Sequence, residues 1–222
     1  MNFYGHAVFA AATHSDSAFV LGAMLPDFIS ILGARPPRLE LGLLARGVAF
    51  HHRTDAVFHD SATFRRLQAQ AASHLSSRGV RRGPTRAVAH VGVELLIDAA
   101  IAGPEPDSAR SRSTAADESY LAALELGASP HAALVWRPPD EPERFMGLCQ
   151  RLRHAGVERF RVDAEQAMVD LARILARRPR LALSEHETRT VSEWANQAFV
   201  VVKAELPALL EELENRLHGH EI

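Results

Sequence analysis

The fold of this chain is decided by one helical stretch, residues 41–60, which reads LGLLARGVAFHHRTDAVFHD. It belongs to a longer pattern, from Leu39 to about Leu75, in which apolar side chains recur every three or four residues. That spacing is typical of one face of an α-helix. Gly47 lies within the pattern and is expected to kink the helix, because glycine costs about 1 kcal/mol relative to alanine in a helix interior.

The segments before and after this helix show the same spacing, and we find no alternation long enough to predict a β-sheet. An apolar stretch over 18–25 is expected to end at Pro26-Asp27, since proline disfavours a helix interior. Thr85 is expected to cap a further helix that ends at Gly103. Both neighbours of the long helix are therefore predicted to be helical.

The second half of the chain is also predicted to be helical. Ser184 and Glu187 have the spacing of a capping box at the start of the last helix, which Pro207 should kink or split. Other helices are expected over 118–126, 140–152 and 162–175. We therefore predict an all-α bundle of seven or eight helices in a single domain over 1–222, with an insertion at 104–135 that opens with a polar linker extending to residue 116.

Composition is that of a soluble protein and excludes several classes of function. The 222 residues are 47% hydrophobic and 23% charged, and the net charge of −2 lacks the strongly basic balance of a general nucleic-acid binder. A single cysteine excludes an internal disulfide and a thiolate metal cluster. Because no uncharged apolar run reaches roughly 18 residues and no leader is recognisable, we expect a cytoplasmic protein without a membrane partner.

Histidines and acids gather inside the helical stretch 41–60. His51, Asp55 and His59 are spaced four residues apart and therefore share one helix face. Imidazole and carboxylate one turn apart allow a single helix to give two ligands to one metal ion. The alternative is a polar stripe whose hydrogen bonds are satisfied by neighbouring loops.

A second set, His90, Glu94 and Asp98, repeats this spacing on a helix otherwise made of apolar residues. Burying these groups without partners would cost several kcal/mol, so they must be paired or bound to a metal. His90 and Glu94 are candidate ligands, whereas Asp98 can equally cap the helix or form a salt bridge. Arginines from elsewhere in the chain are the alternative partners.

Two further candidates lie near the N-terminus. His6 follows the first apolar residues, and Asp27 directly follows Leu-Pro, where the preceding helix is expected to end. An acid at a helix end is presented rather than buried. Each residue alone is a weak signal, since His6 has the alternative of a surface position and Asp27 that of a helix cap.

Imidazole and carboxylate ligands without a thiolate suit Mn²⁺, Fe or Zn²⁺. One or two such ions lower the pKa of bound water and neutralise phosphoryl oxygens, which is the chemistry of phosphoester hydrolysis. The sequence lacks a Gly-x-Ser-x-Gly elbow, a phosphate-binding glycine loop and a dinucleotide fingerprint. Cys149 lies in a predicted helix without an obvious base, so it is not expected to act as a nucleophile.

Three motifs then follow one another along the first half of the chain: MNFxxH at 1–6, LGxxLxDF at 21–28 and GVxxHxRxD at 47–55. In order and approximate spacing they resemble the motifs of acyl-carrier-protein phosphodiesterases, all-α enzymes related to HD-domain phosphohydrolases by circular permutation. A looser resemblance extends over 140–217. The 104–135 segment has no clear counterpart in that family.

The resemblance implies a Mn²⁺-dependent hydrolase that cleaves the phosphodiester between a carrier-protein serine and 4′-phosphopantetheine. It implies a metal centre that includes His6, Asp27, His51 and Asp55. The chain departs from the family at Ala89-His90, where the family has an Asp-His pair. A second resemblance, to zinc-dependent phospholipase-C-like proteins, covers 21–27 and the histidine helix and implies the same chemistry on another phosphodiester.

We therefore predict an HD-domain-like helical bundle that acts as a metal-dependent phosphodiesterase, with Mn²⁺ preferred over Fe or Zn²⁺. Asp27 is expected to bind the metal or to orient the attacking water, and Arg53 to offset charge on the phosphoryl oxygens. The competing prediction is a catalytically silent binding or scaffolding module, and the oligomeric state is left open. The expected metal ligands are His6, Asp27, His51, Asp55, His90 and Glu94.

Overall fold

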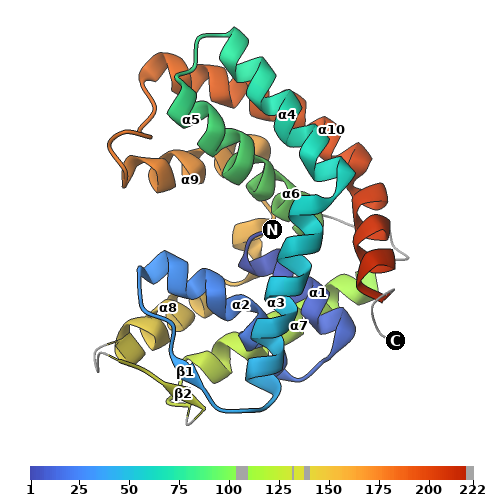
Figure 1. The fold of residues 1–222 in the computed structure, drawn as a ribbon, viewed down its shortest axis with the longest axis vertical. Helices are drawn as coiled ribbons and strands as arrows, with labels where there is room; N and C mark the ends of the chain where they lie inside the picture. Colours follow the sequence, from blue (N-terminus) through green and yellow to red (C-terminus); the bar gives the residue numbers. More distant parts are fainter. Residues whose placement is uncertain (104–109, 132, 138–140, 219–222) are drawn as a thin grey trace. The chain divides into compact units, whose positions relative to one another are not determined.

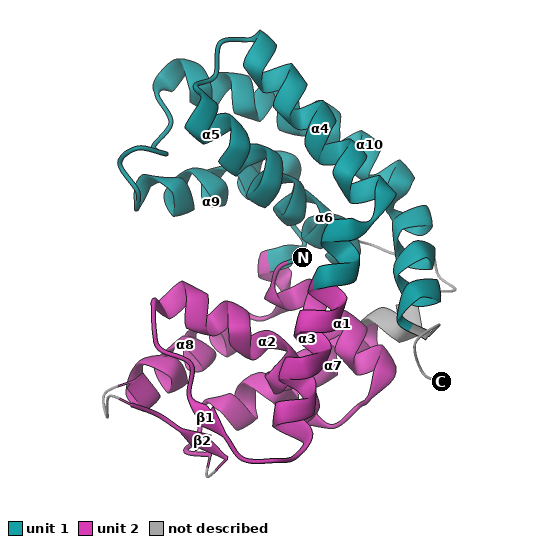
Figure 2. Cartoon of the chain, viewed as in Figure 1, with its two compact units in different colours: residues 1, 56–103, 160–222 teal, residues 2–55, 104–159 magenta. Residues whose placement is uncertain are grey.

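A computed structural model of the chain describes residues 1–103, 110–131, 133–137 and 141–218 (Figure 1). These residues are helical almost throughout, which confirms the predicted all-α class. The chain divides into two compact units, each built from segments that are distant in the sequence (Figure 2). Unit 1 comprises residues 1, 56–103 and 160–222, and unit 2 comprises residues 2–55 and 104–159. An HD-like topology remains a prediction.

Unit 2 contains the N-terminal helices and a later pair of helices that pack on them. A two-residue antiparallel ladder, in which Arg38 pairs with Val135 and Leu39 with Leu134, adds a short strand pair that the sequence did not predict. The elements of unit 2 are α1 (Phe3–Thr13), α2 (Ser17–Leu32), β1 (Arg38–Leu39), the first three turns of α3 (Leu43–Asp60), α7 (Arg110–Gly127), β2 (Leu134–Val135) and α8 (Glu141–Ala155).

Helix α7 forms part of the core of unit 2, although it lies within the segment predicted as an insertion. Its Tyr120 ring meets the Tyr4 ring of α1 edge-on at 5.5 Å, and the Tyr4 hydroxyl donates to Asp117 Oδ1 at 2.7 Å. Both tyrosines are fully buried, so the α1–α7 packing is stabilised by the buried surface of the two rings and by the hydrogen bond of the Tyr4 hydroxyl. Residues 110–116 are helical rather than a linker, and 104–109 lie outside the described residues.

The crossing of α2 and α3 depends on two glycines that face each other. A Cβ atom at Gly47 would lie 2.1 Å from the Phe19 carbonyl oxygen, and one at Gly22 would lie 2.2 Å from the Leu44 carbonyl oxygen. Any side chain there would push the two backbones apart. Gly47 therefore serves a close helix approach, whereas the sequence predicted a kink.

Helix α2 continues through Pro26 to Leu32, so the expectation that it ends at Pro26-Asp27 is wrong. It ends instead at Gly33, which caps it with the left-handed φ of 60° that glycine adopts without strain. Because proline has no N–H, the carbonyl of Gly22 has no helical donor, and the proline ring disturbs the same turn. Asp27 therefore projects from the interior of a helix, one residue after a locally weakened turn.

Unit 1 is built around α10, which packs on α4, α6 and α9 (Figure 1). Between α5 and α6 the helix widens into one π-helical turn, and Gly92 in that turn allows Leu171 and Trp194 to approach closely. The elements of unit 1 are the last turn of α3, α4 (Ala62–Ser77), α5 (Arg82–Ala87), the π-turn η1 (Val88–Gly92), α6 (Val93–Ala102), α9 (Ala164–Ala176) and α10 (Glu185–His218); the short 3₁₀ turn η2 (Val157–Phe160) joins unit 2 to α9.

Two helix boundaries in unit 1 differ from the predicted ones. The long pattern from Leu39 to Leu75 is two helices rather than one, because the Ser61 side chain accepts from Phe64 N and starts α4. Thr85 lies inside α5, where its hydroxyl donates to the Val80 carbonyl, and therefore does not cap that helix.

The predicted capping box at the start of α10 is confirmed. Glu187 Oε2 accepts from Ser184 N at 2.9 Å, and Glu187 N donates to Ser184 Oγ at 3.3 Å. Arg81 also donates to this carboxylate, which holds the pKa of Glu187 at about 2. Helix α10 runs on through Pro207 without being split. None of the described helices combines the length and the apolarity needed to cross a membrane.

Candidate metal centre

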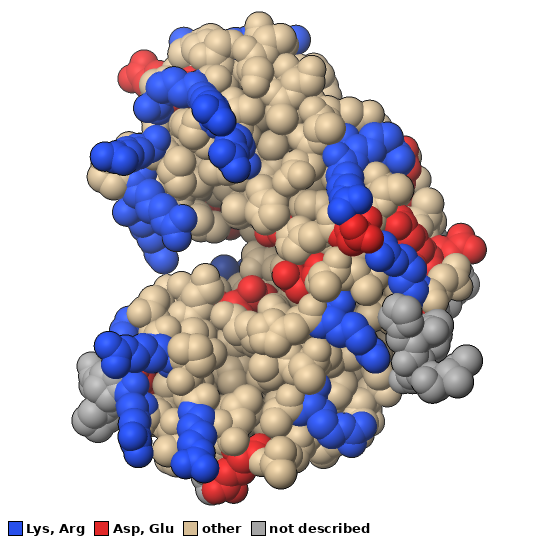
Figure 3. Space-filling model, viewed as in Figure 1, with Lys and Arg blue, Asp and Glu red and all other residues tan. Residues whose placement is uncertain are grey.

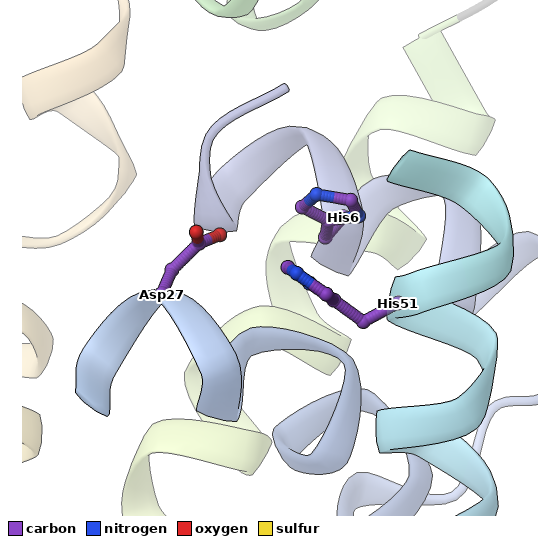
Figure 4. A group of neighbouring side chains, drawn as sticks. All are labelled: His6, Asp27 and His51. Atoms are coloured by element: carbon purple, nitrogen blue, oxygen red, sulfur yellow. The ribbon is translucent and has the colours of Figure 1, made fainter. Parts of the chain in front are cut away.

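Three of the predicted ligands come together within unit 2, one from each of its first three helices. His6 lies on α1, Asp27 on α2 and His51 on α3, and one ligand atom of each lies within 4.8 Å of the other two. Figure 4 shows the three side chains pointing toward one another. Ring centroids of His6 and His51 are 4.0 Å apart. The set is compact enough for one cation to draw together.

The contact between His6 and Thr54 determines which ring nitrogen of His6 carries the proton. His6 Nδ1 lies 3.0 Å from Thr54 Oγ1, while the single hydroxyl proton of Thr54 points to the backbone oxygens of Phe50 and His51, at 3.0 and 2.9 Å. The hydroxyl oxygen is thus left to accept, so Nδ1 of His6 carries the proton. Nε2 then bears a lone pair, and this buried atom has no hydrogen-bond partner among the described residues.

A backbone carbonyl determines which ring nitrogen of His51 carries the proton. Its Nδ1 lies 2.8 Å from the Ala23 carbonyl oxygen, which only accepts, so Nδ1 donates and Nε2 again bears the lone pair. Ala23 lies in the turn of α2 that Pro26 loosens. Metal-binding histidines usually donate their other ring nitrogen to a carbonyl or another oxygen, which fixes both tautomer and ring orientation. Both histidines of this group satisfy that requirement without a metal ion.

Burial keeps both rings neutral. Desolvation lowers the pKa of His6 to about 3, and the nearby Asp55 carboxylate offsets only part of this effect. Desolvation also lowers the pKa of His51, although its bond to Ala23 acts in the opposite direction. A neutral imidazole is the form that binds a metal, so the donor set of two imidazoles and the Asp27 carboxylate fits a divalent cation.

Asp55 and Arg53 lie on other parts of the same helix. Asp55 Oδ1 is 3.8 Å from His6 Nε2, which is beyond hydrogen-bond length, and the Asp55 side chain is 37% exposed. It therefore borders the group on its solvent side. Arg53 places its guanidinium carbon 5.8 Å from the Phe50 ring centroid, two residues beyond His51 and so on a different helix face. Its predicted role toward phosphate stays a prediction.

The two remaining predicted ligands, His90 and Glu94, belong to unit 1. They form a second group with His59, again with ligand atoms within 4.8 Å of one another. The spacing of His51, Asp55 and His59 thus contributes to both groups, since α3 spans residues of both units. His59 was part of the predicted helix face but was not named as a ligand. Its partners come from other helices, which sequence spacing alone does not identify.

The only thiol of the chain is not reactive. Cys149 is fully buried, and desolvation raises the pKa of its thiol to about 12. The nucleophilic thiolate is therefore absent at physiological pH, in agreement with the sequence prediction.

Comparison with known proteins adds no family to these observations. No family model, curated protein or solved structure matches the chain. The resemblance to carrier-protein phosphodiesterases therefore remains a prediction.

Proposed function

We propose that the chain is a metal-dependent phosphoester hydrolase whose metal centre is the His6, Asp27 and His51 group of unit 2. One observation carries this proposal: two buried, neutral imidazoles present Nε2 lone pairs beside a carboxylate. Leaving the buried His6 Nε2 lone pair without a hydrogen-bond donor is costly unless a cation takes the place of that donor.

A divalent cation bound there would lower the pKa of a bound water and neutralise charge on a phosphoryl oxygen. The residues of the chain supply the rest. His6 and His51 are held in position by Thr54 and Ala23, which leaves their Nε2 atoms in place before the cation arrives. Asp55 borders the centre and reaches solvent, so its carboxylate is placed to accept a proton from an attacking water.

The finer proposal is a Mn²⁺ enzyme acting on 4′-phosphopantetheine attached to an acyl carrier protein, as the motif resemblance implies. A charge pattern in unit 1 supports an acidic partner. Arginines gather over α5 and α9 on the face shown in Figure 3. Positive surfaces of this kind speed encounter with negatively charged proteins. Exposed arginines of these helices and their flanks include Arg78, Arg81, Arg82, Arg86, Arg173, Arg177, Arg178 and Arg180.

The competing proposal is a structural metal site in a catalytically silent module. It is favoured by burial, because His6 is 0% and His51 6% exposed. Structural sites are closed, whereas a catalytic centre keeps one coordination position open to water. The two proposals share the metal and differ in turnover.

The first test measures metal content and turnover of tag-free protein. We expect about one equivalent of metal lost on His51→Ala, together with at least a 100-fold loss of bis-p-nitrophenyl phosphate hydrolysis in Mn²⁺. The matched control is His52→Ala, the exposed neighbour on α3, which should keep both. Hydrolysis that survives both chelation and His51→Ala would reject the proposed metal-dependent hydrolase. Bound metal without turnover would favour the structural site.

The second test addresses the substrate. Mass spectrometry of a holo-carrier protein after incubation with the chain should show loss of the phosphopantetheine arm if the finer proposal holds. Hydrolysis of bis-p-nitrophenyl phosphate without loss of that arm would keep the hydrolase and reject the carrier-protein substrate.

A further inference from the structure

The second side-chain group, in unit 1, has the geometry of a metal site of its own. Its donors come from the last turn of α3, the π-turn η1 and the first turn of α6. His59 Nε2 and His90 Nε2 lie 3.5 and 3.4 Å from the same oxygen, Glu94 Oε1. The two imidazole rings are stacked, with centroids 4.8 Å apart and planes 9° from parallel.

These distances fit a bridging cation better than they fit hydrogen bonds. A charge-assisted N–H to carboxylate bond is about 2.7–2.9 Å long, so both contacts are longer than a good hydrogen bond. Zinc bonds of about 2.0–2.1 Å at tetrahedral angles place neighbouring donor atoms roughly 3.3 Å apart. Both nitrogen-to-oxygen distances, 3.5 and 3.4 Å, lie close to that value.

We propose that His59, His90 and Glu94 form a second divalent-metal site in unit 1, of the two-histidine, one-carboxylate type. This donor set binds Zn²⁺ or Fe²⁺ and leaves positions for water or a ligand. The His59, His90 and Glu94 side chains are 30%, 44% and 14% exposed, so solvent reaches the site. It shares no residue with the centre in unit 2 and does not depend on the proposed hydrolase activity.

A local backbone feature places His90 for this role. The helix over 82–102 is α-helical except at η1, where one π-turn covers Val88–Gly92 with His90 at its centre. A single π-turn inside an α-helix is rare and occurs frequently at functional sites. Here it carries the imidazole that stacks on His59 from another helix.

Gln68 controls the proton of His90. Its amide nitrogen lies 2.9 Å from His90 Nδ1 and donates to it, so the proton of the neutral ring is on Nε2 and faces Glu94. Metal binding requires that proton on Nδ1 instead. If the Gln68 amide rotates by a half-turn, its oxygen accepts from His90 Nδ1–H, and Nε2 then carries the lone pair that binds the metal. Rotation of this amide therefore accompanies metal binding.

Two groups next to the site affect how tightly it would bind a metal ion. The amino nitrogen of Met1 lies 3.7 Å from Glu94 Oε1 and competes with a cation for that carboxylate. Replacing Gln68 by glutamate would instead favour the Nδ1–H tautomer, because a carboxylate only accepts. Second-shell changes of this kind alter metal affinity by about 10–100-fold.

The experiment titrates full-length, tag-free, metal-free protein with Zn²⁺ against a chromophoric chelator, and repeats the titration with Co²⁺ to record its visible absorption. We expect two equivalents. His59→Ala, His90→Ala and Glu94→Gln should each lose one of them, and His51→Ala the other. Gln68→Glu should bind the unit 1 equivalent about 10-fold more tightly, a gain that a merely structural glutamine would not give.

The matched control is His186→Ala, an exposed histidine in the first turn of α10, which should keep both equivalents. Unchanged stoichiometry in all three unit 1 variants would overturn the second site. Loss of metal in those variants but not in His51→Ala would leave the second site standing and remove the proposed hydrolase centre, so the two failures are distinguishable.

Discussion

The two histidine groups contain the same chemical types but differ in how their rings are held. In unit 2, Thr54 and the Ala23 carbonyl fix both Nδ1 protons, and His6 and His51 are almost completely buried. In unit 1, a glutamine amide meets His90 Nδ1, and the group is open to solvent. The first group is preorganised for a metal, whereas the second must exchange a tautomer. Preorganisation therefore has a cost in the metal-free protein.

The largest expected effect concerns pH. In metal-free protein kept in chelator, the unfolded chain protonates His6 below about pH 6.5, whereas burial holds the pKa of His6 in the folded chain near 3. Between these values the unfolded state binds more protons, so stability falls as the pH falls, by on the order of 5 kcal/mol over the full window. The lowered pKa of His51 acts in the same direction. Urea denaturation from pH 7 to pH 4 measures the slope.

The variant for this measurement is His6→Gln, which removes the titrating ring and should flatten the slope. His52→Gln, at an exposed position on α3, should keep the wild-type slope. Equal slopes in wild type and His6→Gln would show that His6 is not held neutral by burial, and the contrast between the two groups would be lost.

The next effect concerns the helix crossing that brings α2 and α3 together. Gly47→Ala places a methyl group 2.1 Å from the Phe19 carbonyl oxygen, so the helices must separate. We expect a loss of about 1–3 kcal/mol in the free energy of unfolding, with weaker metal binding at His51, one turn further along α3. Chemical denaturation and Zn²⁺ titration check both effects.

Gly147→Ala is the matched control for this variant. Gly147 lies within α8 of the same unit, where an added Cβ meets only the end of the Arg151 side chain at 3.4 Å. Its replacement should be neutral or stabilising by up to about 1 kcal/mol, since alanine favours helix. A Gly47→Ala protein as stable as wild type would contradict the close crossing.

The smallest effect concerns Thr54. Thr54→Val keeps the shape of the side chain but removes the oxygen that accepts from His6 Nδ1–H. We expect metal affinity of the unit 2 centre to fall by about 10–100-fold, while the unit 1 site is unchanged. Thr54→Ser retains the hydroxyl and should keep affinity near that of wild type. Equal affinity in the valine and serine variants would show that the hydroxyl does not set the tautomer.

Sequence spacing predicts those features that depend on one segment. The helical class, the Ser184–Glu187 capping box and the candidate ligands on single helix faces are local, and periodicity or capping chemistry predicts them. The sequence indicates Asp27 as a candidate for the wrong reason, because Pro26 is expected to end a helix that in fact continues to Leu32. Tertiary packing of a strongly apolar helix overrides that local signal.

The remaining features depend on residues that meet only in three dimensions. Nothing in the sequence associates Gln68 with His90, or Thr54 with His6, since each pair joins different helices. Spacing placed His51 and His59 on one face of α3 but could not assign them to different units. The glycine contact between α2 and α3 cannot be predicted from the sequence for the same reason, since Gly47 by itself indicates only a kink.

That glycine contact also affects how the chain tolerates change. Gly22 and Gly47 each leave room for the backbone of the other helix, so the first methyl group at either position forces the whole separation. A second methyl group enters space that has already opened and costs little more. The two positions are therefore coupled: each alanine is harmful alone, the pair is scarcely worse, and reverting either one in the double variant restores almost nothing.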